Sequence, residues 1–185
     1  MDKKFFDHVR QNLFGGKLTE AQVSGIQRLV TAANFYGMSD YRQVAYLLAT
    51  VFLETDRRMQ PIEEYASGAA YEGRKELGNT VKGDGVRFKG RGDVQITGRR
   101  NYTLFSKILG VDFVNNPALA LEPTNSANIA VIGMMQGRFT GKKLSDYIVC
   151  GQEPDYKNAR RIINGTDKAT LIAGYANQFS TAFGR

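Results

Sequence analysis

The sequence has one cysteine, Cys150, and one histidine, His8. A single cysteine excludes an internal disulfide and the zinc modules that are built from several cysteines. A single histidine excludes zinc sites with two or three histidine ligands, and the HExxH motif is absent. Nucleophilic systems that pair a serine or a cysteine with histidine would depend on His8 alone, near the N-terminus. If the chain is a hydrolase, its catalytic groups are therefore expected to be carboxylates.

Long hydrophobic runs are missing as well. The longest nearly continuous one covers residues 45–53, which is about half of what a bilayer-spanning helix needs. The first residues contain no apolar stretch of the signal-peptide kind. The sequence therefore predicts synthesis as a cytoplasmic chain and no stable insertion into a membrane.

The chain is basic. Of its 185 residues 42% are apolar, which indicates a globular domain with a substantial core, and 25 lysines and arginines against 18 acidic residues give a net charge of +7. A basic surface favours an anionic partner such as nucleic acid, an anionic membrane or an anionic cell-wall polymer. Nucleic acid is disfavoured, because acidic residues are interspersed with the basic ones and no known nucleic-acid-binding pattern is present.

Apolar residues at helical spacing predict that most of the chain is helical. Two helix starts carry capping signals, Thr19 with Gln22 and Asp40 with Gln43. Gly15 and Gly37 are expected to follow helix ends. The predicted helices cover approximately residues 5–13, 20–36, 40–54, 101–109, 125–135, 155–163 and 167–183.

The helical pattern fades between Asp56 and Gly98, where glycines are frequent. Val94 and Ile96, with glycines on both sides, predict one short strand in a small irregular sheet or hairpin. The expected fold is therefore mainly α, one helical domain with a small glycine-rich β hairpin or insertion in its middle.

Glu54 stands out from its helix. It continues the apolar stripe of residues 44, 47, 48 and 51, so its carboxylate is expected in surroundings that disfavour the charged form. A general acid near neutral pH requires such surroundings. The alternative is that the helix has ended by this point and Glu54 is an ordinary solvated residue.

Cleavage of a glycosidic bond needs a second carboxyl group. Spacing alone does not choose among the downstream candidates, which are Asp56, Glu63, Glu64, Glu72 and Glu76. The glycine-rich segment 88–102 permits close backbone approach to a ligand, and its polar side chains are of the kind that bind sugar hydroxyl and N-acetyl groups. The alternative for this segment is a purely structural hairpin.

Residues 88–102 resemble the Y-G-R-G-x-x-Q-L-[TS]-x-x-x-N-Y signature of family 19 glycoside hydrolases, chitinase-like enzymes with a lysozyme-like fold. The resemblance is closer to bacteriophage and prophage members that act as endolysins. It extends along nearly the whole chain through residues 13–19, 54–55, 59–62, 139–144 and 160–165. It implies a lysozyme-like helical domain whose β insertion flanks the substrate cleft.

The resemblance also implies catalytic roles. Glu54 matches the general acid of the family's H-E-[TS] element, although Leu53 replaces the histidine. Glu64 matches the second glutamate of phage members, with Glu63 as a close competitor that is otherwise expected to contact substrate. Glu76 stands at the spacing of plant-type enzymes and is a lesser candidate for the base.

Other positions are implied to act on the substrate or on water. Thr97 matches the hydroxyl residue that helps to hold the attacking water. The remaining matches to substrate-binding positions are Gln95, Asn101, Tyr102 and Asn164. Arg161 is expected to meet carboxylates of the peptide stems in the cleft, the alternative being an ordinary solvated charge.

The implied activity is hydrolysis, with inversion, of the β-1,4 bond between N-acetylmuramic acid and N-acetylglucosamine in bacterial peptidoglycan. The alternatives are a chitinase and a catalytically inactive wall-binding domain. Residues 1–185 are expected to form a single catalytic domain with no separate wall-binding domain, to act as a monomer, and to need no cofactor or metal. The protein is expected to wait in the host cytoplasm until a separate membrane-permeabilising protein releases it to the cell wall at lysis.

Overall fold

The structure, a computed structural model, describes residues 1–184. The α-helices are α1 (Lys3–Asn12), α2 (Glu20–Phe35), α3 (Tyr41–Glu54), α4 (Asp84–Arg87), α5 (Arg99–Leu109), α6 (Pro123–Gln136) and α7 (Ala169–Ala182). The short 3-10 helices are η1 (Ala69–Tyr71), η2 (Lys75–Leu77), η3 (Pro117–Leu121), η4 (Leu144–Asp146) and η5 (Asn158–Ile162). The strands β1 (Ile62–Glu63) and β2 (Arg91–Gly92) form a two-stranded antiparallel sheet.

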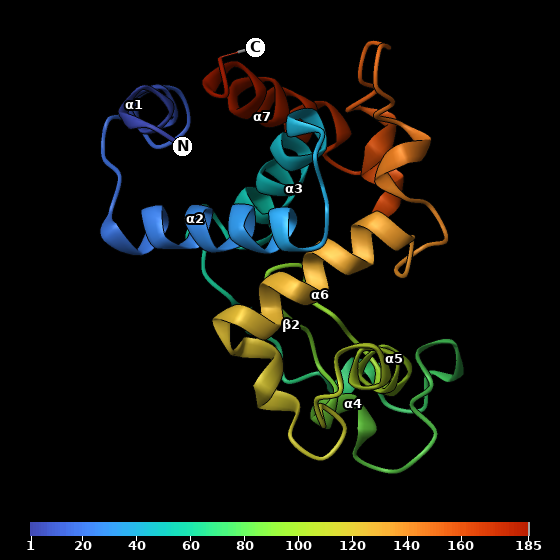
Figure 1. Cartoon of the computed structure of the whole chain (residues 1–185). Helices are drawn as coiled ribbons and strands as arrows, with labels where there is room; N and C mark the ends of the chain where they lie inside the picture. Colours follow the sequence, from blue (N-terminus) through green and yellow to red (C-terminus); the bar gives the residue numbers. More distant parts are fainter. Residues whose placement is uncertain (185) are drawn as a thin grey trace.

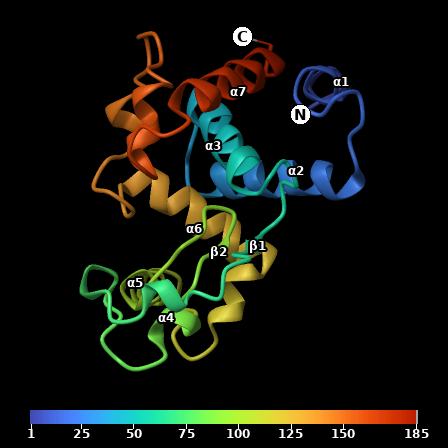
Figure 2. The same ribbon diagram turned by 180° about the vertical axis from the view of Figure 1, so that it is seen from behind.

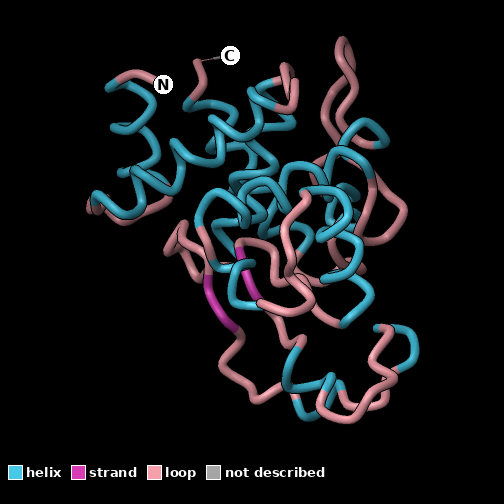
Figure 3. The backbone as a smooth tube through the Cα atoms, turned by 60° about the horizontal axis from the view of Figure 1, so that its bottom comes forward, coloured by secondary structure: helices cyan, strands magenta, loops and turns pink. Residues whose placement is uncertain are grey.

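The elements fall into two parts. Helices α1, α2, α3 and α7 gather at one end of the molecule, and α4 and α5 lie with the intervening loops at the other (Figure 1). Helix α6 runs between these two parts, and the chain passes from the end of α3 to β1 beside β2 (Figure 2). The strands are short and lie beside each other, with loops leading into and out of them (Figure 3). The mainly helical architecture with a small β element agrees with the prediction.

Capping places the starts of the first helices. The Thr19 hydroxyl accepts from the Gln22 backbone N–H at 3.2 Å, and the Gln22 side chain accepts from the Thr19 N–H at 2.9 Å. The Asp40 carboxylate accepts from the Arg42 N–H at 3.0 Å. Each bond satisfies an N–H that the helix itself leaves unpaired. Both predicted helix starts are therefore confirmed.

Helix α3 forms the centre of the core. Residues 44–52 are all buried, which is unusual for a helix with one apolar stripe and reflects packing against both α7 and α2. Phe52 makes edge contacts with the rings of Phe14, Tyr175 and Phe179. Burial of one such ring contributes about 1.5–3 kcal/mol. The core thus fixes the axis of the helix that ends in Glu54.

The strand prediction is wrong in position. Val94 and Ile96 are buried but belong to no strand, and Ile96 makes only a single bridge with Arg91. Gly92 (φ 94°) and Gln95 (φ 54°) are both left-handed, so the segment between them turns instead of extending. The alternating apolar pattern reflects burial of a turn against the core.

Two predicted helices near the C-terminus also differ. The segment predicted as 155–163 is the 3-10 helix η5, with the bond from the Ile163 N–H to the Arg160 carbonyl spanning three residues. Helix α7 begins at Ala169 rather than Asp167, because Lys168 is left-handed with φ 56°. No helix within residues 1–184 has the length and apolarity needed to span a membrane.

Candidate active site

Glu54 is the last residue of α3 and continues its buried apolar face, as predicted, but its surroundings differ from the expected ones. Its Oε1 accepts a hydrogen bond from Nη1 of Arg160 at 2.7 Å, and the Arg160 side chain is 4% exposed. Arg160 Nε donates to the Asp167 backbone carbonyl at 3.0 Å, which fixes the guanidinium. The expectation of surroundings that disfavour the charged form is therefore wrong, because η5 brings a buried cation to the end of α3.

Leu53 occupies the position where the family resemblance expects a histidine. It packs against the core and lines a small hollow together with Phe52 and Tyr175. An apolar side chain fits these surroundings. The polar partner of Glu54 comes from Arg160 instead of from residue 53.

Glu64 lies just after β1 and is held by two donors. The Tyr71 hydroxyl donates to its Oε1 at 2.8 Å, and the Gly90 backbone N–H donates to its Oε2 at 3.0 Å. The hydrogen bond from Tyr71 to Glu64 raises the pKa of Tyr71, and partial burial and the negative charge of Glu64 raise it further. The Tyr71 hydroxyl therefore remains protonated and can donate. The carboxylate is thereby fixed in orientation, one donor to each oxygen.

Gly90 allows this arrangement because it has no side chain. A Cβ at this position would lie 2.8 Å from Gln95 Oε1 and 3.2 Å from Glu64 Oε2. Residue 90 must therefore be glycine for its backbone to lie this close to the side chains of Glu64 and Gln95. The glycine-rich segment does bring polar side chains together, as the sequence indicates.

Glu63 is engaged differently from its neighbour. It pairs with Arg91 across the β1–β2 sheet, with Arg91 Nε at 2.8 Å from its Oε1, and Lys89 Nζ lies 3.3 Å from its Oε2. Burial raises the pKa of Glu63, but hydrogen bonds and charge from Lys89 and Arg91 outweigh burial and lower it. A carboxylate that is stabilised by two cations is a weak base, so the geometry favours Glu64 for that role.

The other carboxylate candidates are Asp56, Glu72 and Glu76. The Glu72 carboxylate accepts from the N–H groups of Gly83 and Gly85 at 2.7 and 2.9 Å and so orders the start of α4. Glu76 is exposed and pairs with Arg74 at 2.6 Å, a hydrogen bond that lowers the pKa of Glu76. Asp56 is exposed in the turn after Glu54. Within residues 1–184, none of these three carboxylates is hydrogen-bonded to the glycine-rich segment as Glu64 is to Gly90.

Gln95, Thr97 and Asn101 form a chain of hydrogen bonds along the glycine-rich segment. Gln95 Nε2 donates to the carbonyl groups of Ile62 and Gly92 at 2.7 and 2.9 Å. The Thr97 hydroxyl donates to the Gln95 carbonyl at 3.1 Å, and Asn101 Nδ2 donates to the Thr97 carbonyl at 2.9 Å. These three predicted residues therefore lie together, beside β1 and the Glu64 segment.

Tyr102 is fully buried, and the prediction that it contacts substrate is wrong. Its hydroxyl donates to the Lys89 carbonyl at 2.8 Å and accepts from Arg91 Nη1 at 3.0 Å, and its ring packs 5.2 Å from that of Phe88. Burial raises the pKa of Tyr102 to about 12. Tyr102 instead fixes the backbone of residues 88–91, which carries Gly90.

Arg161 and Asn164 are exposed, on and after η5, on a different segment from Glu64. The Thr140 hydroxyl anchors this segment by donating to the Arg161 carbonyl at 2.6 Å. The sequence pattern points to Arg161, whereas its neighbour Arg160 contacts Glu54. A signal for Arg160 was present, since it lies between Ala159 and Ile162, which are both buried.

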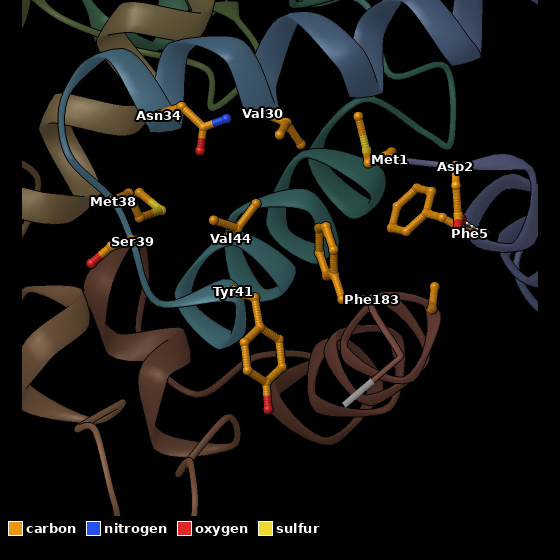
Figure 4. A pocket seen from close by; sticks show the side chains of 11 residues that line it. Met1, Asp2, Phe5, Val30, Asn34, Met38, Ser39, Tyr41, Val44 and Phe183 are labelled. Carbon is orange, nitrogen blue, oxygen red and sulfur yellow. Dashed lines mark hydrogen bonds between the residues drawn. The ribbon is translucent and has the colours of Figure 1, made fainter.

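A hollow of about 450 Å³ lies among α1, α2, α3 and α7 (Figure 4). Tyr41 and Val44, in the first turn of α3, line it together with Phe5 and Phe183. Glu54 is at the opposite end of the same helix, about 15–20 Å away along its axis. None of the predicted catalytic residues lines this hollow, so it lies apart from the candidate site.

Known proteins share sequence with parts of the chain. An acidic 27 kDa endochitinase of Solanum lycopersicum is 33% identical over 93 residues, 44% of this chain and 38% of that protein. A glycosyl hydrolase family 19 domain-containing protein of Haemophilus influenzae is 38% identical over 58 residues, 31% of this chain and 29% of that protein. The chain spans less than half the length of these relatives. No protein-family model matches it.

The fold has relatives over its whole length. The family GH19, class IV chitinase from Zea mays superposes with a TM-score of 0.64, covering 98% of this chain and 92% of that structure at 17% identity. At this identity the match shows the fold alone. The predicted lysozyme-like fold of family 19 chitinases is thereby confirmed.

Proposed function

We propose that this chain is a glycoside hydrolase related to the family 19 chitinases, with Glu54 as general acid and Glu64 as general base. The observation that carries the proposal is the pair of separately supported carboxylates. Glu54 faces the buried Arg160, and Glu64 is oriented by Tyr71 and Gly90. Two carboxyl groups with different surroundings match the two different roles that hydrolysis of a glycosidic bond requires.

In the first role Glu54 donates its proton to the glycosidic oxygen. Negative charge then develops on the Glu54 carboxylate, and Arg160 already lies within hydrogen-bond distance of it. A donor that is in place before the reaction stabilises developing charge without reorganisation. Arg160 is thus a positioning and electrostatic residue for the acid.

In the second role Glu64 takes a proton from the water that attacks the anomeric carbon. Tyr71 and Gly90 hold the carboxylate so that it turns little when water binds. Thr97, in the neighbouring segment, is proposed to help to hold this water. Inversion requires space for the water, so we expect the Glu54 and Glu64 carboxyl groups to be about 6.5–9.5 Å apart.

We further propose that the substrate is the β-1,4 bond between N-acetylmuramic acid and N-acetylglucosamine in peptidoglycan, and that the protein acts as an endolysin. The net charge of +7 supports this choice, because bacterial walls are anionic. Chitin is the second candidate, since one relative is named an endochitinase.

The test compares wild type, Glu54→Gln, Glu64→Gln and the control Glu76→Gln on purified peptidoglycan and on a chitin oligosaccharide. We expect both site variants to lose at least about a hundredfold in rate, with Glu76→Gln close to wild type. New N-acetylmuramic acid reducing ends identify a muramidase, and cleavage of chitin alone identifies a chitinase. Binding without cleavage of either substrate by the wild type would overturn the assignment as an enzyme.

A further inference from the structure

The turn that follows Glu54 is strained. Asp56, Arg57 and Met59 have φ values of 48°, 64° and 55°. Three of the four residues 56–59, none of which is glycine, are therefore left-handed. The left-handed region is unfavourable for residues other than glycine, and it persists only where surrounding contacts fix it. Strain of this kind is concentrated at functional sites. The contacts that fix this turn therefore indicate which side chain it holds in position.

Thr55 links the end of α3 to the last residue of the turn through its hydroxyl group. It is buried, its hydroxyl donates to the Val51 carbonyl at 2.7 Å, and the same oxygen accepts from the Met59 N–H at 3.0 Å. Met59 is itself fully buried. Both ends of the turn are thus tied to the end of α3.

Helix α2 fixes the turn from outside. Gln22 Nε2 donates to the Arg57 carbonyl at 3.0 Å, and Arg28 Nη2 donates to the Met59 carbonyl at 3.4 Å. Gly25 allows this close approach, because a Cβ there would lie 1.8 Å from the Met59 carbonyl oxygen. The turn is therefore held rigidly in a conformation that its own sequence disfavours.

The turn presents Arg58. Its guanidinium carbon lies 5.9 Å from the centre of the Tyr65 ring, and Tyr65 is 80% exposed. Arg58 follows Glu54 by four residues, and Tyr65 follows Glu64 directly. Within residues 1–184, Arg58 has no acidic partner, unlike Arg91 and Arg160. An exposed guanidinium without a partner, oriented by an aromatic ring, thus joins the two segments that carry the candidate catalytic carboxylates.

We propose that Arg58 is a specificity-determining residue that binds carboxylate groups of the glycan substrate. A guanidinium matches the geometry of a carboxylate with two parallel hydrogen bonds. Peptidoglycan strands carry carboxylates on the peptide stems of N-acetylmuramic acid, whereas chitin is neutral. Arg58 therefore selects peptidoglycan over chitin. This inference rests on the proposed function and specifies its substrate class.

Arg57 provides a matched control. It is the adjacent residue, has the same charge and is also exposed, but its guanidinium carbon lies 5.7 Å from the Phe52 ring, and it lines a hollow with Tyr175 of α7. Replacement of either arginine by glutamine removes one charge from the same turn. A difference between the two variants therefore reports on position and not on net charge.

The experiment uses wild type, Arg58→Gln and Arg57→Gln with two preparations of the same sacculi, free of phosphate polymers. One preparation is native, and in the other the carboxylates are converted to amides. We expect Arg58→Gln to lose about tenfold in kcat/KM on native sacculi and less than about twofold on amidated ones, since charge-assisted hydrogen bonds are lost only on the former. Arg57→Gln is expected to resemble wild type on both, and thermal unfolding checks that each variant is folded.

Equal losses by Arg58→Gln on native and amidated sacculi would overturn the proposal, and so would equal losses by the two arginine variants on native sacculi. Cosedimentation with both preparations measures binding independently of cleavage. If wild type cleaves neither preparation, the proposed function fails. Cosedimentation then still decides whether Arg58 recognises carboxylates. If it does, wild type binds native sacculi better than Arg58→Gln does, and the two proteins bind amidated sacculi equally.

Discussion

Glu64 and Gly90 are joined by two hydrogen bonds in opposite directions. The Glu64 backbone N–H donates to the Gly90 carbonyl at 2.9 Å, and the Gly90 N–H donates to the Glu64 carboxylate at 3.0 Å. The first bond continues the pairing of β1 with β2, and the second orients the candidate base. The position of this carboxylate therefore follows from a close backbone approach at residue 90.

Gly90→Ala is expected to displace the Glu64 carboxylate. The new Cβ would lie 2.8 Å from Gln95 Oε1 and 3.2 Å from Glu64 Oε2, so at least one of these side chains must move. A misplaced catalytic group costs about a hundredfold in rate. Steady-state kinetics should show this loss mainly in kcat.

Gly174→Ala is the matched control for this change. Nothing lies within 4 Å of the Cβ that it would add in α7, and alanine favours a helix over glycine by up to about 1 kcal/mol. This variant should keep full activity and unfold at the same or a higher denaturant concentration. Full activity in Gly90→Ala would show that Glu64 is not the base or that it tolerates displacement.

Arg160→Met is expected to lower the free energy of unfolding by about 2–4 kcal/mol, because it leaves the Glu54 carboxylate without its buried cation. The Arg160 side chain is 4% exposed and that of Glu54 21%. Urea unfolding of Arg160→Met, Glu54→Gln and the double variant should give a coupling energy of at least about 1 kcal/mol. Arg161→Met, at the exposed neighbour, should change stability by less than about 0.5 kcal/mol.

Tyr71→Phe should affect activity more than stability. It removes the hydroxyl that donates to Glu64 Oε1 at 2.8 Å and leaves the Gly90 donor in place. One lost hydrogen bond to a charged group corresponds to about 1.5–3 kcal/mol, or about ten- to a hundredfold. We expect that loss in kcat. Tyr36→Phe at the end of α2 is the control, and equal behaviour of the two variants would argue against Glu64 as the base.

Local signals explain what the sequence could predict. The capping residues Thr19 and Asp40 and the apolar spacing along 44–51 are local features, each contained within one helix. They were therefore enough to predict where the helices start and that Glu54 lies at the end of its helix. The partner of Glu54 did not follow. Arg160 lies 106 residues further along the chain and reaches Glu54 only through packing of η5. Contacts of that range depend on the fold.

The glycine-rich segment shows a second limit. Strands of two residues, such as β1 and β2, are too short to show an alternating pattern, so the buried Val94 and Ile96 resembled a strand more than Arg91–Gly92 did. Tyr102 lies inside the family signature yet is buried, because a signature preserves residues that support a site as well as those that touch substrate. A sequence motif does not separate these two kinds of residue.

The Asp84–Arg99 pair should make stability depend on acid pH. Arg99 donates to both oxygens of Asp84 at 2.6 and 2.9 Å, and the Asp84 side chain is 2% exposed. The hydrogen bonds from Arg99 outweigh burial and lower the pKa of Asp84. A carboxyl group with a lower pKa in the folded state contributes stability above its unfolded pKa of about 3.9, and this is lost as pH falls through the folded value.

Asp84→Asn should therefore destabilise the protein most near neutral pH. At pH 7 we expect a loss of about 1.5–3 kcal/mol, because the charge-assisted hydrogen bonds from Arg99 to Asp84 are lost. The gap to wild type should narrow as the pH falls below about 4. Urea unfolding at several pH values measures this gap, with Asp56→Asn at an exposed position as the control. A gap of constant size would show that ionisation of Asp84 does not provide the stabilisation. The Thr80 and Val81 N–H groups also donate to this carboxylate. Because asparagine keeps an acceptor oxygen for those groups, a narrowing gap would instead assign the stabilisation to the charge of Asp84.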